Sequence, residues 1–247
     1  MIFQNLRTRI KPPFMLLILL VLFLQSCPPT KTNAEDFASK RNAMVANQLI
    51  RRGISDPAVI RAMKKVERHQ FVPEKYRIEA YEDYPLPIGF DQTISQPYIV
   101  ALMTETLGLK GNEKILEIGT GSGYQAAILA EICHSVFTVE ILDELGENAD
   151  MTLKRLGYKN VRVKIGDGYQ GWEEHAPYDA IIVTCAPTHI PPELIRQLKE
   201  NGKMIIPVGE SRKQELILLV KTRNGLNAKS VIPVRFVPMT RPNGKTY

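Results

Sequence analysis

Residues 115–124 (ILEIGTGSGY) run from a short apolar stretch into three glycines that stand at every second position. The apolar part has the length and composition of a buried strand, and the residues after Gly123 have those of a helix. Glycine tolerates positive φ and, having no Cβ, lets a ligand come close to the backbone. The segment therefore predicts a strand, a tight turn and a helix that together border a ligand site.

Beyond this segment, short β-branched runs alternate with helical stretches. The predicted strands are 114–118, 135–140, 161–165, 179–184 and 203–208, and the predicted helices are 124–132, 143–156 and 192–200. Buried strands that alternate with helices indicate a parallel sheet with right-handed crossovers. Two further runs, 215–221 and 231–237, have a linker too short for a helical crossover, which predicts an antiparallel hairpin at the sheet edge. The expected fold is α/β, with a mostly parallel, doubly wound sheet and an antiparallel C-terminal edge.

Three acidic residues lie at the C-terminal ends of consecutive predicted strands or just after them. Glu117 precedes the glycines, Glu140 comes roughly twenty residues after them, and Asp167 lies between two glycines. Open α/β sheets bind ligands at this edge, so we expect the three carboxylates to serve one site. Glu140 can accept from ribose hydroxyls, Asp167 from an adenine amino group, and Glu117 can hold an ammonium group. The alternative for each acid taken singly is a solvated helix cap.

The glycine pattern favours one adenosine-containing cofactor over another. A nicotinamide fingerprint requires a glycine where this chain has Tyr124, and its pyrophosphate needs a helix N-terminus without a carboxylate nearby. Glu117 would repel that phosphate. S-adenosylmethionine has an ammonium group and no phosphate, so the sequence predicts this molecule as the cofactor.

The composition excludes several other classes. Of the 247 residues 44% are apolar and 23% charged, as in a soluble globular protein of one large domain. The net charge of +6 includes three basic residues near the N-terminus, and without them 29 basic residues face 26 acidic ones, which is too even for nucleic-acid binding. The three cysteines form no CxxC pair, so we expect neither a disulfide framework nor a metal site.

The N-terminus has the features of a leader. A basic stretch precedes residues 14–24 (FMLLILLVLFL), an apolar run about half as long as a membrane-spanning helix. This order matches a secretory signal, and LQSC at 24–27 resembles a bacterial lipobox in which Cys27 would be acylated. The alternative is an upstream start codon, with Met15 or Met44 as the true first residue.

We therefore predict a leader and tether at 1–36 and a single domain at 37–247. Within the domain, 37–110 would form N-terminal helices and a substrate-side segment, and 111–247 the cofactor-binding core with the C-terminal strands. A helix is predicted from residue 37 to residue 52, ending at Gly53. Ser55-Asp56-Pro57 predicts an N-cap followed by a proline at or near the first position of a second helix, which runs through Val66. Residues 69–89 show no period and are expected to be irregular.

The polar stretch 91–97 (DQTISQP) stands before an apolar, helix-like run. Ser95 is expected near the helix cap and Pro97 in the first turn. Such a helix start leaves backbone N–H groups free and creates a field that favours an anion. The stretch is therefore a candidate for binding an anionic substrate as well as a helix start.

From about residue 44 to 238 the chain resembles the protein-L-isoaspartate O-methyltransferase family. The matching stretches are VERHQFV at 66–72, LPIG at 86–89, QTISQP at 92–97, LEIGTGSGYQ at 116–125, GDG at 166–168, DAIIVTCA at 179–186, PVG at 207–209 and VRFVP at 234–238. The glycine turn is shared by adenosylmethionine methyltransferases in general, whereas QTISQP placed before it is specific to this family.

The resemblance implies a Rossmann-like domain that uses S-adenosylmethionine, without a metal, to methylate the free α-carboxylate of L-isoaspartyl residues in damaged or aged proteins and peptides. The site serine of the family falls on Ser95, with Thr93 and Ile94 beside it on the substrate side. The family's cofactor contacts fall on Glu117, Gly119, Thr120, Gly121, Ser122, Gly123, Glu140, Asp167 and Gly168.

The sequence is also compatible with two other functions. One is methylation of another carboxylate substrate by the same cofactor domain, and the other is a non-catalytic, membrane-tethered binding module of the same fold. S-adenosylmethionine is made in the cytosol, so the chemistry predicts a cytoplasmic location. The resemblance implies action on many isoaspartyl proteins, and a monomer is expected. The leader instead predicts export or a lipid anchor on Cys27, with membrane association.

Overall fold

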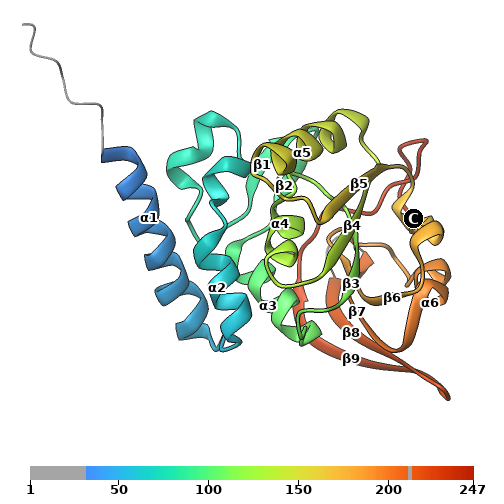
Figure 1. Ribbon diagram of the computed structural model, residues 1–247. Helices are drawn as coiled ribbons and strands as arrows, with labels where there is room; N and C mark the ends of the chain where they lie inside the picture. The colour runs from blue at the N-terminus through green and yellow to red at the C-terminus, as the bar shows by residue number, and fades with distance from the viewer. Residues whose placement is uncertain (1–31, 211–212) are drawn as a thin grey trace, which may run out of the picture.

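The computed structural model describes residues 32–210 and 213–247. A central twisted sheet carries helices on both faces, and further helices extend the molecule at its N-terminal end (Figure 1). The predicted leader, with Cys27, lies outside the described residues, and the predicted division of the chain into leader and domain stays a prediction. No helix within the described residues has the length and apolarity that a membrane crossing requires.

The N-terminal helices end close to their predicted boundaries, but the first one begins earlier than predicted. Helix α1 (Thr32–Met44) begins before the expected residue 37 and continues through a π-helical and a 3₁₀ turn to Gly53, whose φ of +96° ends it. Helix α2 (Pro57–Lys65) starts after Asp56, whose carboxylate accepts hydrogen bonds from two backbone N–H groups of the first turn. The N-cap and the proline behind it were both predicted from the sequence.

Residues 69–89, expected to be irregular, end in the first strand of a small hairpin, so that prediction was wrong in part. After 3₁₀ turns at Arg68–Phe71 and Glu74–Glu79, strand β1 (Leu86–Gly89) pairs with β2 (Gln92–Ile94). Residues 90 and 91 form the two-residue turn between the strands. The first and last partners of the hairpin, Leu86 and Ile94, are buried in the core and attach it to the domain.

The main sheet has the order β5-β4-β3-β6-β7-β8-β9. The strands are β3 (Lys114–Ile118), β4 (Ser135–Glu140), β5 (Val161–Ile165), β6 (Tyr178–Val183), β7 (Leu198–Glu210), β8 (Lys213–Thr222) and β9 (Gly225–Val234). The first five are parallel, and β8 and β9 add antiparallel pairs at one edge (Figure 1). The predicted α/β class and its antiparallel edge are confirmed. The linker predicted at 222–230 was wrong, because β9 begins at Gly225.

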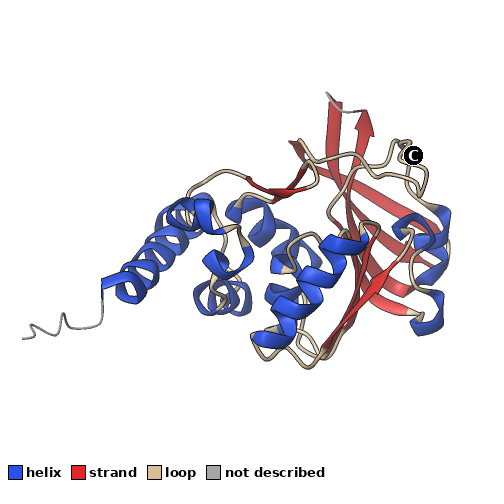
Figure 2. Cartoon of the chain, turned by 90° about the horizontal axis from the view of Figure 1, so that it is seen from above, coloured by secondary structure: helices blue, strands red, loops and turns tan. Residues whose placement is uncertain are grey.

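The sheet separates two apolar clusters, which explains why its central strands are apolar on both faces. Ile115 points into the cluster shared with α3 (Pro97–Leu107), α4 (Tyr124–Ala130), α5 (Asp143–Arg155) and the N-terminal helices. Its neighbour Leu116 points into the smaller cluster beneath α6 (Pro192–Gln197). Figure 2 shows the larger helical layer on one side of the strands and the smaller one on the other.

Candidate active site

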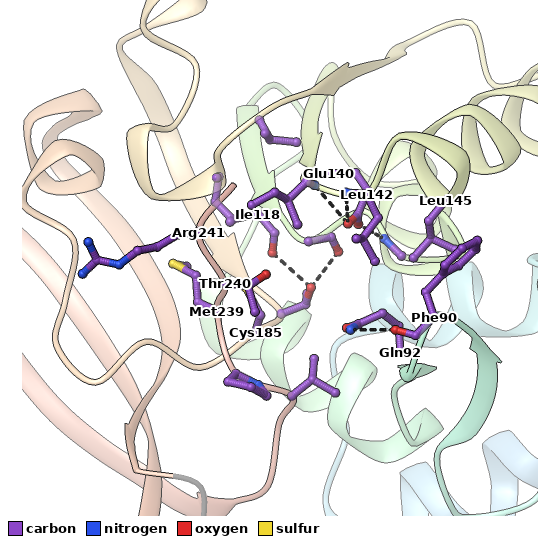
Figure 3. Close-up of a pocket in the computed structure, with 18 of the residues that line it drawn as sticks. Phe90, Gln92, Ile118, Glu140, Leu142, Leu145, Cys185, Met239, Thr240 and Arg241 are labelled. Carbon is purple, nitrogen blue, oxygen red and sulfur yellow. Dashed lines mark hydrogen bonds between the residues drawn. The ribbon is translucent and has the colours of Figure 1, made fainter. Parts of the chain in front are cut away.

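A cavity of about 280 Å³ lies where the parallel strands end, next to the point at which the strand order reverses between β3 and β6. In Figure 3, Leu145 and Phe90 border it on one side, and Met239, Thr240 and Arg241 border it on the other. Its wall therefore combines the ends of the core strands with the β1–β2 hairpin and with residues 237–244.

The glycine turn forms the part of the wall that follows β3. Gly119 has a φ of +93° and Gly121 a φ of +54°, both in the left-handed region that side chains disfavour. A Cβ at Gly119 would stand 2.5 Å from the Thr184 hydroxyl oxygen, so no larger residue fits there. The Ile88 side chain lies 3.4 Å from the place where a Cβ of Gly121 would be, so the hairpin packs over this turn.

Glu117 is a fully buried carboxyl group directly behind the wall. Neither of its oxygens has a hydrogen-bond partner within the part of the chain that the structure describes. Burial raises the pKa of Glu117 to about 8, with nearby Glu140 adding to the effect and the Thr138 hydroxyl opposing it. An unpaired buried carboxyl group next to a cavity suits a cationic ligand group, so this residue fits the ammonium of S-adenosylmethionine.

Glu140 lies on the cavity wall and ties two loops together. Its carboxylate accepts hydrogen bonds from the backbone N–H groups of Gly121 at 2.8 Å, Ile141 at 3.0 Å and Leu142 at 3.1 Å. A carboxylate has about four lone-pair sites, so capacity remains for a ligand hydroxyl. Glu140 thus holds the glycine turn against the loop after β4, a structural role that sequence reasoning had missed.

Asp167 is engaged on both of its oxygens. One accepts from the Tyr169 backbone N–H at 3.0 Å, and the other accepts from the Tyr247 hydroxyl. The Tyr247 ring stacks on Tyr169 with ring centroids 4.0 Å apart. Only Gly168 of this loop reaches the cavity wall. The Tyr247 hydroxyl therefore stands where the sequence predicted an adenine amino group.

The other predicted cofactor residues lie around the cavity at different depths. Thr120 is buried and shares a hydrogen bond of 2.7 Å with Thr138. Ser122 faces a separate shallow hollow, and Gly123 opens helix α4. The structure thus places Gly119, Gly121, Glu140 and Gly168 on the wall of the cavity, whereas Glu117, Thr120, Ser122, Gly123 and Asp167 lie behind or beside it.

A second cavity of about 460 Å³ adjoins the first and contains the predicted substrate side. Thr93 and Ser95 line it, together with residues 233–237 at the end of β9. Ser95 stands one residue before Gln96, the N-cap of α3, and Pro97 takes the first helical position as predicted. The side chain of Ile94 is buried in the core, so it anchors this segment and does not face the cavity. Thr184 and Val237 line both cavities and were not predicted as site residues.

Solved structures define the class of protein to which this fold and site belong. A structure of a protein-L-isoaspartate O-methyltransferase matches with a TM-score of 0.74 and 33% identity, over 83% of this chain and 67% of the other. A second one, from Plasmodium falciparum and in complex with S-adenosyl-L-homocysteine, matches with a TM-score of 0.70 and 28% identity, over 83% and 98% of the two chains. The fold is that of the S-adenosylmethionine-dependent, Rossmann-like methyltransferases.

Sequence comparison narrows the class to one family. The family model of protein-L-isoaspartate(D-aspartate) O-methyltransferase matches residues 39–244. A protein-L-isoaspartate O-methyltransferase of Synechococcus sp. is 55% identical over 85% of this chain and 90% of its own length. One of Gloeobacter violaceus is 56% identical over 80% of this chain and 97% of its own length. The chain belongs to this family, which confirms the resemblance found in the sequence.

Proposed function

We propose that this protein transfers a methyl group from S-adenosylmethionine to the free α-carboxylate of L-isoaspartyl residues in damaged or aged proteins and peptides. The observation that carries the proposal is family membership over residues 39–244, at about 55% identity to relatives that bear this name. The two adjoining cavities, one bordered by the glycine turn and one by Ser95, suit a reaction between a donor and a separate acceptor.

The substrate side needs to orient an anion more than to change its protonation. A carboxylate is ionised at neutral pH, because its ordinary pKa is about 4, so no general base is required. Thr93 and Ser95 offer hydroxyl groups that can hold a carboxylate oxygen without neutralising its charge. The N-terminus of α3 adds backbone N–H groups beside them. The chief tasks of these residues are therefore orientation and exclusion of water.

On the cofactor side we assign one role to each acidic residue. S-adenosylmethionine, when bound, supplies an electrophilic methyl group on a sulfonium. Glu117 would pair with its ammonium group, Glu140 would accept from its ribose hydroxyls, and Asp167 would accept from its adenine amino group. Small or backbone contacts would come from Gly119, Thr120, Gly121, Ser122, Gly123 and Gly168.

A methylation assay with matched peptides tests the proposal. A peptide with one L-isoaspartyl residue, the same peptide with normal aspartate, and a small free carboxylic acid are each incubated with methyl-labelled S-adenosylmethionine. Base-labile label on the isoaspartyl peptide alone is the expected result. Equal labelling of the small acid would favour a different carboxylate substrate, and cofactor binding without any labelling would favour the non-catalytic module.

We also propose that the protein works in the cytoplasm, as a monomer, on many different isoaspartyl proteins. The supply of S-adenosylmethionine in the cytosol supports the location. Cell fractionation followed by mass spectrometry of the mature N-terminus tests it, and an acylated Cys27 would contradict it. Sedimentation of the purified protein tests the oligomeric state.

A further inference from the structure

The two cavities meet at a wall made of Thr93, Thr184 and Val237, which line both of them. Methyl transfer requires the donor carbon and the acceptor oxygen to be in contact and aligned, so it takes place where the cavities join. Thr93 comes from the hairpin and Val237 from the segment after β9. Thr184 alone comes from the core sheet, directly after β6 and beside β3.

The Thr184 hydroxyl is bound to the start of the glycine turn. Its Oγ1 lies 3.0 Å from the carbonyl oxygen of Ile118 and 2.7 Å from that of Gly119. The hydroxyl has a single hydrogen, which these two acceptors share. The backbone N–H of Thr184 also donates to the Ile118 carbonyl at 2.9 Å. Thr184 therefore sets the direction of two carbonyl groups whose residues line the cofactor cavity.

Gly119 and Thr184 are complementary in shape. A Cβ on Gly119 would stand 2.5 Å from the Thr184 Oγ1, so the hydroxyl occupies the space that the missing side chain leaves. Because a β-branched residue is stiff at χ1, a hydroxyl held by two carbonyls also fixes the direction of the Thr184 methyl group. One side chain thus connects the geometry of the glycine turn to that of the shared wall.

We propose that Thr184 is a positioning residue for the methyl transfer: its hydroxyl holds the glycine turn in its cofactor-binding form, and its fixed side chain sets the junction between the two cavities. This inference rests on the proposed function and adds to it a residue that directly follows β6. It separates the role of the hydroxyl, which acts on the cofactor side, from that of the methyl group, which acts on the shape of the junction.

Two substitutions test the proposal, because they should have different effects on cofactor affinity and on kcat. Thr184→Val keeps the shape and removes the hydroxyl, and Thr184→Ser keeps the hydroxyl and removes the methyl group. Titration calorimetry with S-adenosylhomocysteine should give a Kd about tenfold weaker for Thr184→Val and within about twofold of wild type for Thr184→Ser, as expected for the loss of one hydrogen bond. On an isoaspartyl peptide, kcat should fall ten- to a hundredfold for the valine variant and only severalfold for the serine variant.

Thr106→Val is the matched control, because it removes a hydroxyl that donates to the Leu102 carbonyl at 2.7 Å within α3, on neither cavity wall. It should leave Kd and kcat unchanged. If Thr184→Val does not fold, as judged by thermal unfolding, Thr184→Ala replaces it in the calorimetry, with the same tenfold loss of affinity expected. Alanine also lacks the methyl group, so its kcat should fall at least as far as that of the valine variant.

Unchanged cofactor affinity in the valine variant, or equal loss in the valine and serine variants, would overturn the role of the hydroxyl. Calorimetry does not depend on the methyl acceptor, so failure of the proposed function, seen as a wild-type protein inactive on the isoaspartyl peptide, is distinguishable from failure of this inference.

Discussion

Glu117 shows how one buried side chain links the fold to its ligand. Burial raises its pKa from an ordinary value of about 4.5 to about 8. Between these two values the unfolded chain has lost the proton and the folded chain retains it, so the folded state binds more protons. The contribution of the Glu117 proton to the free energy of unfolding is therefore at its full value below pH 4.5. It falls by at most about 1.4 kcal/mol per pH unit as the pH rises, and it is lost by pH 8.

The variant Glu117→Gln should therefore remove part of the pH dependence of stability. Urea unfolding at about pH 5.5 and about pH 7.5 should show that the wild type loses roughly 2–3 kcal/mol more than the variant over this range. The variant should also bind S-adenosylhomocysteine more weakly, because glutamine cannot pair with an ammonium as an anion does. Parallel stability curves for the two proteins would contradict the assigned pKa.

Ser95 is the residue on which the substrate side is most directly tested. It lines the second cavity and not the first, so Ser95→Ala should lower kcat on an isoaspartyl peptide about ten- to a hundredfold and leave cofactor affinity unchanged. Ser230→Ala is a suitable control, since that hydroxyl binds Glu215 on the exposed side of β9. An unaltered kcat in the Ser95 variant would remove Ser95 from the site.

At the scale of elements, the sequence predicted the central strands well and the hairpin poorly. Strands β3, β4 and β5 match their predicted bounds, because each is a short β-branched run that pairs on both sides or packs under helices. The hairpin has no such local signal. Its two-residue turn needs positive φ at both positions, which usually calls for Asn-Gly, and here the residues are Phe90 and Asp91, with φ of 53° and 55°. Its stability comes from tertiary contacts of Leu86 and Ile94.

Substitutions at this turn and at the residue before it should change stability in opposite directions. Asp91→Gly relieves a left-handed residue and should stabilise the protein by about 0.5–1 kcal/mol, after the entropy of glycine is counted. Gly89→Ala places a side chain at a residue with φ +98°, where the Cβ would have no atom within 4 Å. The variant should destabilise the protein by about 1 kcal/mol, because the backbone conformation disfavours a side chain even though there is space for it. Thermal unfolding measures the melting temperature of both variants against that of the wild type. Melting temperatures that shift in the same direction would show that the turn is not strained.

At the scale of the whole molecule, the site could be predicted only where it follows from topology. Residues at the ends of consecutive parallel strands must meet at one edge, so Gly119, Glu140 and Gly168 could be assigned to one cavity from the sequence. Thr184 also ends a predicted parallel strand, but its role depends on a hydroxyl contact with the glycine turn that spacing in the sequence does not show. The segment 237–247 could not be assigned, because the path of a chain after its last strand leaves no periodic signal. Tyr247 reaches Asp167 across a sequence separation of 80 residues.

The contact between Tyr247 and Asp167 should compete with the cofactor. Burial and the hydrogen bond to Asp167 raise the pKa of Tyr247 to about 12, so the phenol stays protonated and donates to the carboxylate oxygen that an adenine amino group would need. Removing the phenol hydroxyl frees that oxygen while the ring can keep its stack on Tyr169. In the wild type, the cofactor has to displace the hydrogen bond between Tyr247 and Asp167. The Tyr247→Phe variant has no such bond, so it should bind S-adenosylhomocysteine about two- to tenfold more tightly.

Calorimetry with two ligands makes this prediction specific to the adenine end of the cavity. An analogue of S-adenosylhomocysteine with unsubstituted purine in place of adenine has neither the amino group nor a ring N–H and cannot donate to Asp167, so its affinity should change much less in Tyr247→Phe than that of S-adenosylhomocysteine. Tyr169→Phe removes the hydroxyl of the stacked partner, which lies on neither cavity wall, and should change neither affinity. Weaker binding of S-adenosylhomocysteine by Tyr247→Phe would mean that the phenol orients Asp167 for the cofactor, and the contact would then belong to the bound form of the site.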